Sequence, residues 1–146
     1  MIKESYRYFD LNDKMQYFFA SEGKQGKILK SILFTYSEDN LWNLGFGDWH
    51  DGDIDDSIIT NNHDIVKLIS TIAKIVYEFS NEYPSRDIYI QPVDDKRKKL
   101  YNHVFRRNQK DINLVFNIVG IINGLDEDYL PEKFYDKFKL KRKFVK

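Results

Sequence analysis

The sequence of 146 residues contains no cysteine, which excludes disulfides, thiolate metal ligands and a cysteine nucleophile. It also lacks a long apolar run. The longest strongly apolar stretch, residues 114–122, is interrupted by Asn117 and Gly120 and is far shorter than the roughly 20 residues that span a bilayer. Residues 1–7 reach charged side chains at once and show no secretory segment. These absences predict a cytoplasmic protein without a membrane partner.

Net charge is absent as well, because 23 Lys and Arg balance 23 Asp and Glu. A chain of this kind does not bind polyanions over its whole surface. The charges are nevertheless segregated: residues 48–56 hold acids and no Lys or Arg, whereas residues 96–110 and 133–146 are rich in Lys and Arg. We therefore expect two patches of opposite charge. The 42% hydrophobic content is enough for one core, so we expect a single domain over residues 1–146.

The first half of the chain has the pattern of an antiparallel meander. Aromatic or alternating segments separated by turn residues predict four strands, at residues 5–11, 15–20, 27–36 and 41–47. From residue 62 the apolar side chains recur at helical spacing, and Pro84 marks the end of this first helix. Asn61 or Asn62 is expected to cap it.

The second half continues as strand, helix and strand. We expect a strand at residues 87–93, a second helix that is capped by Asp94 or Asp95 and runs to about Asn108, and a strand at residues 112–121. Residues 125–146 are expected to form a basic C-terminal extension or a short helix, which Pro131 would open at residues 132–140. The predicted fold class is therefore α+β, with a meander followed by helix, strand, helix and strand.

This order of elements resembles the N-acetyltransferase fold that uses acetyl-CoA. In that family, backbone amides of a glycine-rich loop before the long helix hold the cofactor pyrophosphate. Here the corresponding turn is Ile59-Thr60-Asn61-Asn62-His63-Asp64, which has neither the glycines nor the arginine of the family pattern. The resemblance implies a possible ligand turn at Asn61, Asn62, His63 and Asp64, and an alternative function as an acyltransferase.

A second resemblance is to a family of uncharacterised bacterial domains, many from Bacteroidetes, with a pattern from Asn-Leu-x-Phe-Gly-Asp to Arg-x-x-Leu-Tyr. Here the pattern covers Asn43 to Tyr101, and its ends are Asn43-Leu44-Gly45-Phe46-Gly47-Asp48 and Arg97 with Leu100-Tyr101. His63 replaces a family glycine, and Pro92-Val93-Asp94 stand in place of Gly-Ser-Thr. The resemblance implies a fold and a bacterial origin, but no activity.

The acidic segment Asp48 to Asp56 has the oxygen-rich composition that hard cations prefer, but its spacing does not match an EF-hand loop. We expect a solvated loop before the first helix and no metal site. The three histidines, His50, His63 and His103, have no signature partner for general base catalysis. No hydrolase or phosphate-loop motif is present.

The basic residues of the second helix form the strongest candidate site. They would contact an anionic partner, nucleic acid or an acidic protein, and are Lys96, Arg97, Lys99, Arg106, Arg107 and Lys110. The tail adds Lys137, Lys139, Lys141, Arg142, Lys143 and Lys146. Interleaved aromatic residues would stack on bases if exposed, or face the core, and are Tyr101, Phe105, Phe134, Phe138 and Phe144.

The sequence therefore favours a non-enzymatic binding module without a cofactor, in which Arg97 ranks first among the contact residues. An acyltransferase that uses acetyl-CoA remains the alternative. A third hypothesis is an oligomeric interaction subunit whose exposed aromatic residues form a homo-oligomer interface.

Overall fold

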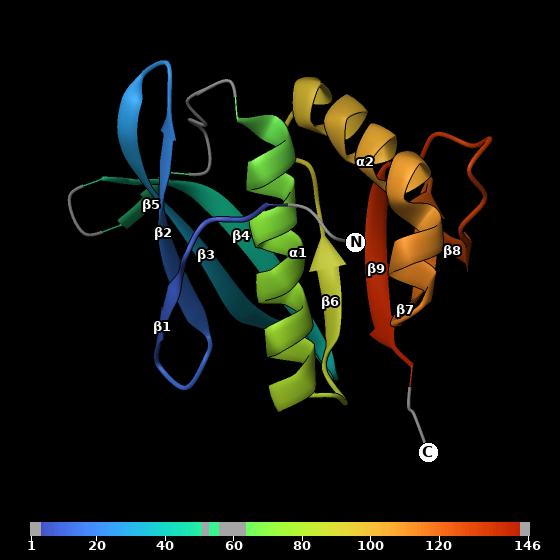
Figure 1. The fold of residues 1–146 in the computed structure, drawn as a ribbon. Helices are drawn as coiled ribbons and strands as arrows, with labels where there is room; N and C mark the ends of the chain where they lie inside the picture. The colour runs from blue at the N-terminus through green and yellow to red at the C-terminus, as the bar shows by residue number, and fades with distance from the viewer. Residues whose placement is uncertain (1–3, 51–52, 56–63, 144–146) are drawn as a thin grey trace. The chain divides into compact units, whose positions relative to one another are not determined.

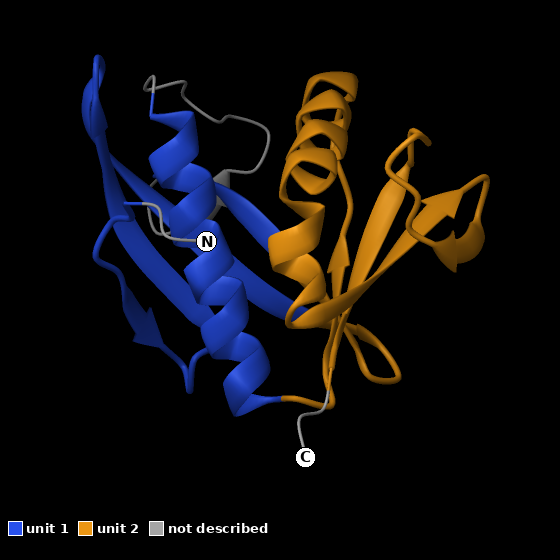
Figure 2. Ribbon diagram, turned by 45° about the vertical axis from the view of Figure 1, so that its right-hand side comes forward, with its two compact units in different colours: residues 1–35, 44–83 blue, residues 36–43, 84–146 orange. Residues whose placement is uncertain are grey.

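The computed structural model describes residues 4–50, 53–55 and 64–143. The chain forms two compact units that interleave along the sequence, coloured separately in Figure 2. Unit 1 contains residues 1–35 and 44–83, and unit 2 contains residues 36–43 and 84–146. The expectation of a single domain stays a prediction.

Unit 1 contains the expected meander and the long helix. Its elements are β1 (Phe9–Leu11), β2 (Gln16–Gly23), most of β3 (Gly26–Glu38), most of β4 (Leu41–His50), β5 (Asp53–Asp55) and α1 (Ile65–Glu82). The strands follow the order β1-β2-β3-β4, and β5 pairs with β4. Short turns connect β1 to β2 and β2 to β3, so these pairs are antiparallel, as the meander pattern predicts. The pairing of β4 with β5 is antiparallel as well.

The core of unit 1 lies between this sheet and α1. Alternate side chains of a strand point to the same face, so Ile32 and Phe34 of β3 are both buried. The Phe34 ring stacks on Phe79 of α1 with 3.8 Å between the ring centres. On α1, Leu68, Ile75 and Phe79 face this core, which confirms the helical period read from the sequence.

In unit 2, the first residues of β4 pair in parallel with β6 (Asp87–Ile90). It continues with α2 (Asp95–Asn113), β7 (Phe116–Ile122), β8 (Leu125–Asp128) and β9 (Lys137–Arg142). The strand order is β4-β6-β9-β7-β8, so the last strand of the chain lies between β6 and β7 (Figure 1). Helix α2 packs on this sheet through Phe105, whose ring stacks on Phe138 of β9. Together the elements confirm the α+β fold class.

The prediction of a short helix at residues 132–140 is wrong. Residues 137–142 form β9, and residues 125–128 form β8, so the C-terminal segment is part of the sheet rather than an extension of it. The residues of β9 alternate between lysine and apolar side chains up to Lys141, and only Phe138 and Leu140 are buried. That period of two fits a strand and not a helix.

The acidic segment also differs from the expectation of a loop. Residues up to His50 extend β4, and Asp53–Asp55 pair with it as β5. Asp48 is buried and forms an ion pair with Lys30 of β3, whose side chain is 1% exposed. A buried carboxylate needs such a partner, because burying it alone costs several kcal/mol.

The helix starts agree in part with the predictions. Asp94 caps α2 as expected, and its carboxylate accepts a hydrogen bond of 2.8 Å from the backbone N–H of Arg97. Helix α1 begins after Asp64, and the predicted caps Asn61 and Asn62 lie outside the described residues. Within the described part of the chain, neither helix has the length and apolarity needed to cross a membrane.

Candidate functional site

One side of α2 carries a stripe of basic residues. Lys96, Lys99, His103, Arg106, Arg107 and Lys110 are all exposed. They follow one another at intervals of one, three or four residues, which places them on one side of a helix with 3.6 residues per turn. From Lys96 to Lys110 the stripe extends about 21 Å at 1.5 Å per residue. We refer to these six residues as the basic stripe.

The basic stripe contains no acid and no apolar side chain. Asp95 and Asp111, the acidic residues of α2, lie at its two margins. Within the described residues, Lys96, Lys99, Arg107 and Lys110 form no ion pair, whereas Lys98 on another side of α2 pairs with Asp136 at 2.6 Å. Arg106 donates a hydrogen bond to the carbonyl oxygen of Pro131. The stripe is therefore a run of cations that are not neutralised within unit 2.

Arg97, the first-ranked candidate, lies on the buried side of the helix. It is 8% exposed, and its guanidinium forms an ion pair of 3.1 Å with Asp94. No partner for its Nε is present among the described residues. The structure thus separates Arg97 from the other five predicted contact residues, which all belong to the basic stripe.

The described basic residues of the C-terminal segment do not form one cluster, because several have their own contacts on or near β9. Lys139 pairs with Asp126 of β8, and Lys133 pairs with Glu127 of the same strand, each at 2.9 Å. Hydrogen bonds from Lys133 and Tyr135 hold the pKa of Glu127 below its usual value. Lys143 donates to the carbonyl oxygen of Asn113. Lys133 and Lys139 thus pair with acids of β8, Lys143 contacts the end of α2, and Lys146 lies outside the described residues.

The candidate stacking residues divide into two groups. Phe105 and Phe138 stack on each other in the core of unit 2. Phe134 is 49% exposed and lies 5.4 Å from the Lys98 ammonium, and Tyr101 is partly exposed. Phe144 lies outside the described residues. Two of the five aromatic side chains are thus structural.

Of the predicted ligand turn, the structure describes Asp64, while Asn61, Asn62 and His63 lie outside the described residues. The carboxylate of Asp64 accepts hydrogen bonds from the hydroxyl groups of Tyr6, at 2.5 Å, and Ser21, at 2.6 Å. Burial, and then the hydrogen bond to Asp64, raise the pKa of Tyr6. Asp64 therefore ties the start of α1 to the N-terminal segment and β2.

The ion pair between Lys30 and Asp48 was not predicted from the sequence. The signal was present, because Lys30 has the same parity as Ile28, Ile32 and Phe34 in the predicted strand 27–36, and residues two apart in a strand share a face. A lysine on that face requires a buried acid. Among the described residues, no group of three or more histidine or acidic side chains is placed to hold a metal ion.

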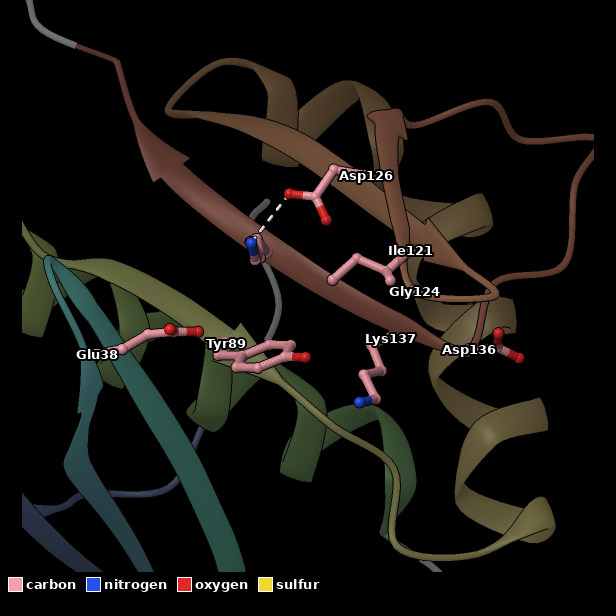
Figure 3. A pocket seen from close by; sticks show the side chains of 8 residues that line it. Glu38, Tyr89, Ile121, Gly124, Asp126, Asp136 and Lys137 are labelled. Carbon is pink, nitrogen blue, oxygen red and sulfur yellow. Dashed lines mark hydrogen bonds and ion pairs between the residues drawn. The ribbon is translucent and has the colours of Figure 1, made fainter.

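A pocket of about 480 Å³ lies in unit 2 (Figure 3). Lys137 and Lys139 of β9 line it, together with Tyr89 of β6, which pairs directly with Lys139. The other lining residues are Glu38, Ile121, Gly124, Asp126 and Asp136. Phe138 of β9 faces α2, so the lysines on either side of it face the opposite side of the sheet. The pocket is therefore on the face of the sheet opposite α2.

Both lysine ammonium groups lie near the Tyr89 ring, with Nζ atoms 5.7 Å and 5.8 Å from the ring centre for Lys137 and Lys139. Both distances fall within the range of a cation–π contact. Sequence analysis assigned Lys137 and Lys139 to a basic tail. The missing signal was the pairing of β9 with β6, which residues about fifty positions apart do not reveal locally.

A comparison with protein families gives one match. The model of a family of unknown function, DUF6934, matches residues 2–143. No curated protein and no solved structure shows significant similarity to the chain. The motif pattern and the resemblance to acetyltransferases stay predictions. Since the match covers both units almost completely, the chain belongs to this family of unknown function, DUF6934.

Proposed function

We propose that this protein binds nucleic acid through the basic stripe of α2, by contacts with the phosphate backbone. The observation that carries the proposal is the stripe itself: exposed cations along about 21 Å of one helix side, without an acid among them. Lysine and arginine that neutralise phosphates release condensed counterions, and this release drives binding that does not depend on sequence.

The composition of the stripe favours nucleic acid over an acidic protein. The central part of a protein interface is usually apolar and aromatic, with few charges. The basic stripe has no apolar residue; the neighbouring Leu100 and Val104 are only partly exposed, and Phe105 is buried. Contacts with phosphate oxygens are made by lysine, arginine and other hydrogen-bond donors, and they need no apolar residue. We assign the contacts to the five Lys and Arg residues of the stripe, with His103 between them.

The other two hypotheses keep their own tests. An acyltransferase would bind acetyl-CoA saturably, and replacement of Asn62 or Asp64 would abolish activity. An oligomeric subunit would show a dimer whose population depends on protein concentration. The described residues supply no specific observation that favours either one over the basic stripe.

The test is fluorescence anisotropy with a labelled single-stranded oligonucleotide and a labelled duplex. We compare the natural protein with the triple variant Lys96→Gln/Lys99→Gln/Arg107→Gln, which removes three stripe cations that have no ion pair among the described residues. The matched control is Lys24→Gln/Lys27→Gln/Lys141→Gln, which removes three exposed cations elsewhere. We expect the stripe variant to bind at least about tenfold more weakly and the control to bind nearly normally. Equal loss in both variants contradicts the proposal, and binding of a poly-glutamate peptide in preference to both oligonucleotides identifies an acidic protein partner instead.

A further inference from the structure

The pocket on the face of the unit 2 sheet opposite α2 has the size of a small-molecule site. Its volume of about 480 Å³ lies in the range of roughly 300–1,000 Å³ that such sites occupy. Its lining residues come from five strands, β3, β6, β7, β8 and β9, together with Gly124 between β7 and β8 and Asp136 before β9. The basic stripe is on the other side of the sheet, and the pocket is therefore independent of the proposed function.

The charges of the pocket are only partly neutralised. Asp126 pairs with Lys139 at 2.9 Å. Asp136 accepts hydrogen bonds from Lys98, at 2.6 Å, and from the backbone N–H of Asn123, at 2.9 Å. Those contacts hold its pKa below the usual value, so Asp136 stays ionised and engaged.

Two lining groups of opposite charge remain for a ligand. Glu38 and Lys137 form no ion pair with any residue in the described part of the chain. Figure 3 shows Glu38 on one side of Tyr89 and Lys137 on the other, with the Tyr89 hydroxyl directed toward the side of Lys137. The pocket thus presents a carboxylate, an aromatic ring and an ammonium group in that order.

These groups select the chemistry of the ligand. A planar ring stacks on tyrosine, and stacking of a base on an aromatic side chain is worth about 1–3 kcal/mol. A carboxylate accepts hydrogen bonds from an exocyclic amino group, as it does from N4 of cytosine. An ammonium group binds a phosphate as a point charge. A nucleoside monophosphate whose base carries an amino group combines all three features.

We propose that the pocket binds an amino-bearing nucleotide, with its base on Tyr89, its amino group at Glu38 and its phosphate at Lys137. Cytidine and uridine monophosphates form a matched pair of probes, because one presents an amino group where the other presents a carbonyl. A carbonyl oxygen opposite the Glu38 carboxylate has no proton to donate, so uridine monophosphate binds more weakly.

The test is a titration of the full chain with each nucleotide, monitored through the NMR chemical shifts of the backbone amides of unit 2. Cytidine monophosphate is expected to shift signals of β6 and β9 saturably, and at least about tenfold more tightly than uridine monophosphate or inorganic phosphate. Glu38→Gln is expected to reduce the difference in affinity between cytidine monophosphate and uridine monophosphate. Lys137→Gln is expected to weaken both by about tenfold.

Lys141→Gln is the matched control, since Lys141 is exposed on β9 and does not line the pocket. It is expected to bind both nucleotides like the natural protein. Equal affinity for the two nucleotides, tighter binding of inorganic phosphate, or shifts confined to α2 would each overturn the proposal. The triple variant of the basic stripe separates the two proposals, because it should bind cytidine monophosphate normally.

Discussion

At the scale of single residues, the sharpest departure from the sequence pattern is the ion pair between Lys30 and Asp48. Both side chains are 1% exposed, and they join β3 to β4 inside unit 1. Lys30 pairs across the sheet with Phe19, in a region that is otherwise aromatic. Such a pair is required once one partner is present, because a lone buried charge is costly.

Removal of one partner of this pair is expected to destabilise the protein strongly. Asp48→Ala should lower the free energy of unfolding by about 3–5 kcal/mol, since it leaves the Lys30 ammonium without its carboxylate partner. The double variant Lys30→Met/Asp48→Leu should recover much of that loss. Urea denaturation measures both, and Lys27→Met is the control. It breaks an exposed pair with Glu22, 3.4 Å apart, and should cost less than about 1 kcal/mol. A double variant as unstable as Asp48→Ala would contradict this account.

The raised pKa of Tyr8 predicts how the stability of the protein changes at alkaline pH. Burial, and then the Glu78 carboxylate, to which its hydroxyl donates at 3.2 Å, raise the pKa of Tyr8 to about 12. The unfolded chain releases the phenolic proton near pH 10, whereas the folded chain still holds it, so the free energy of unfolding falls between about pH 10 and 12.

Urea denaturation across this pH range, compared between the natural protein and Tyr8→Phe, measures the effect. The variant is expected to lose less stability with rising pH. Tyr36→Phe changes an exposed tyrosine and serves as the control, because its pH profile should follow that of the natural protein. A Tyr8→Phe profile identical to that of the natural protein would show that Tyr8 does not keep its proton.

At the scale of elements, two glycines in strands differ in the space that they leave for a side chain. A Cβ atom at Gly120 of β7 would overlap the buried Tyr135 ring, whereas a Cβ atom at Gly45 of β4 would meet only the carbonyl oxygen of Leu33, at 3.4 Å. Tyr135 is itself fixed, because its hydroxyl contacts Glu127 and the N–H of Leu130, each at 2.9 Å. It cannot move aside without losing these contacts.

Gly120→Ala is therefore expected to lower the free energy of unfolding by about 1–3 kcal/mol, the usual cost of overpacking a core. Gly45→Ala should cost less than about 1 kcal/mol. Thermal denaturation of both variants provides the comparison, and equal melting temperatures would contradict the close packing of Tyr135 on β7.

The elements also show what the sequence could and could not predict. The first helix and the meander followed from local periodicity, because their apolar spacing is regular over many residues. The C-terminal strand β9 did not, since Pro131 and a run of charges suggested a helix start, and its burial depends on pairing with β6 and β7. The place of Lys137 in the pocket was not predicted either, because it depends on the same pairing of β9 with β6. Five of the six predicted contact residues on α2 share one exposed side, whereas the burial of Arg97 depends on tertiary packing.

Hydrogen exchange tests the placement of β9. Backbone amides of residues 138–141 are expected to exchange slowly, because this strand lies between β6 and β7. The exposed segment around Lys24 is a suitable reference for fast exchange. Fast exchange along the whole of residues 137–142 would mean that the segment is a free extension.

At the scale of the whole molecule, a chain of zero net charge carries on one side of α2 a run of Lys and Arg residues that form no ion pair with the described residues. Lysines of the C-terminal segment pair with acids of β8, so the segregated charges of the sequence partly cancel when the sheet forms. The Lys and Arg residues of the basic stripe are not neutralised in this way by any acid among the described residues. The chain belongs to DUF6934, a family of unknown function, so the family supplies no activity. The proposal of nucleic-acid binding rests on the basic stripe alone.

The most direct test of that proposal is the salt dependence of oligonucleotide affinity. Binding through the stripe predicts that the logarithm of the association constant falls linearly with the logarithm of salt concentration, with a slope of about −0.7 per phosphate contacted on a single strand. Five stripe cations allow at most five such contacts, and the triple variant Lys96→Gln/Lys99→Gln/Arg107→Gln should reduce the slope by about two. The same slope in the natural protein and the triple variant would contradict the account, because the contacts would then lie elsewhere.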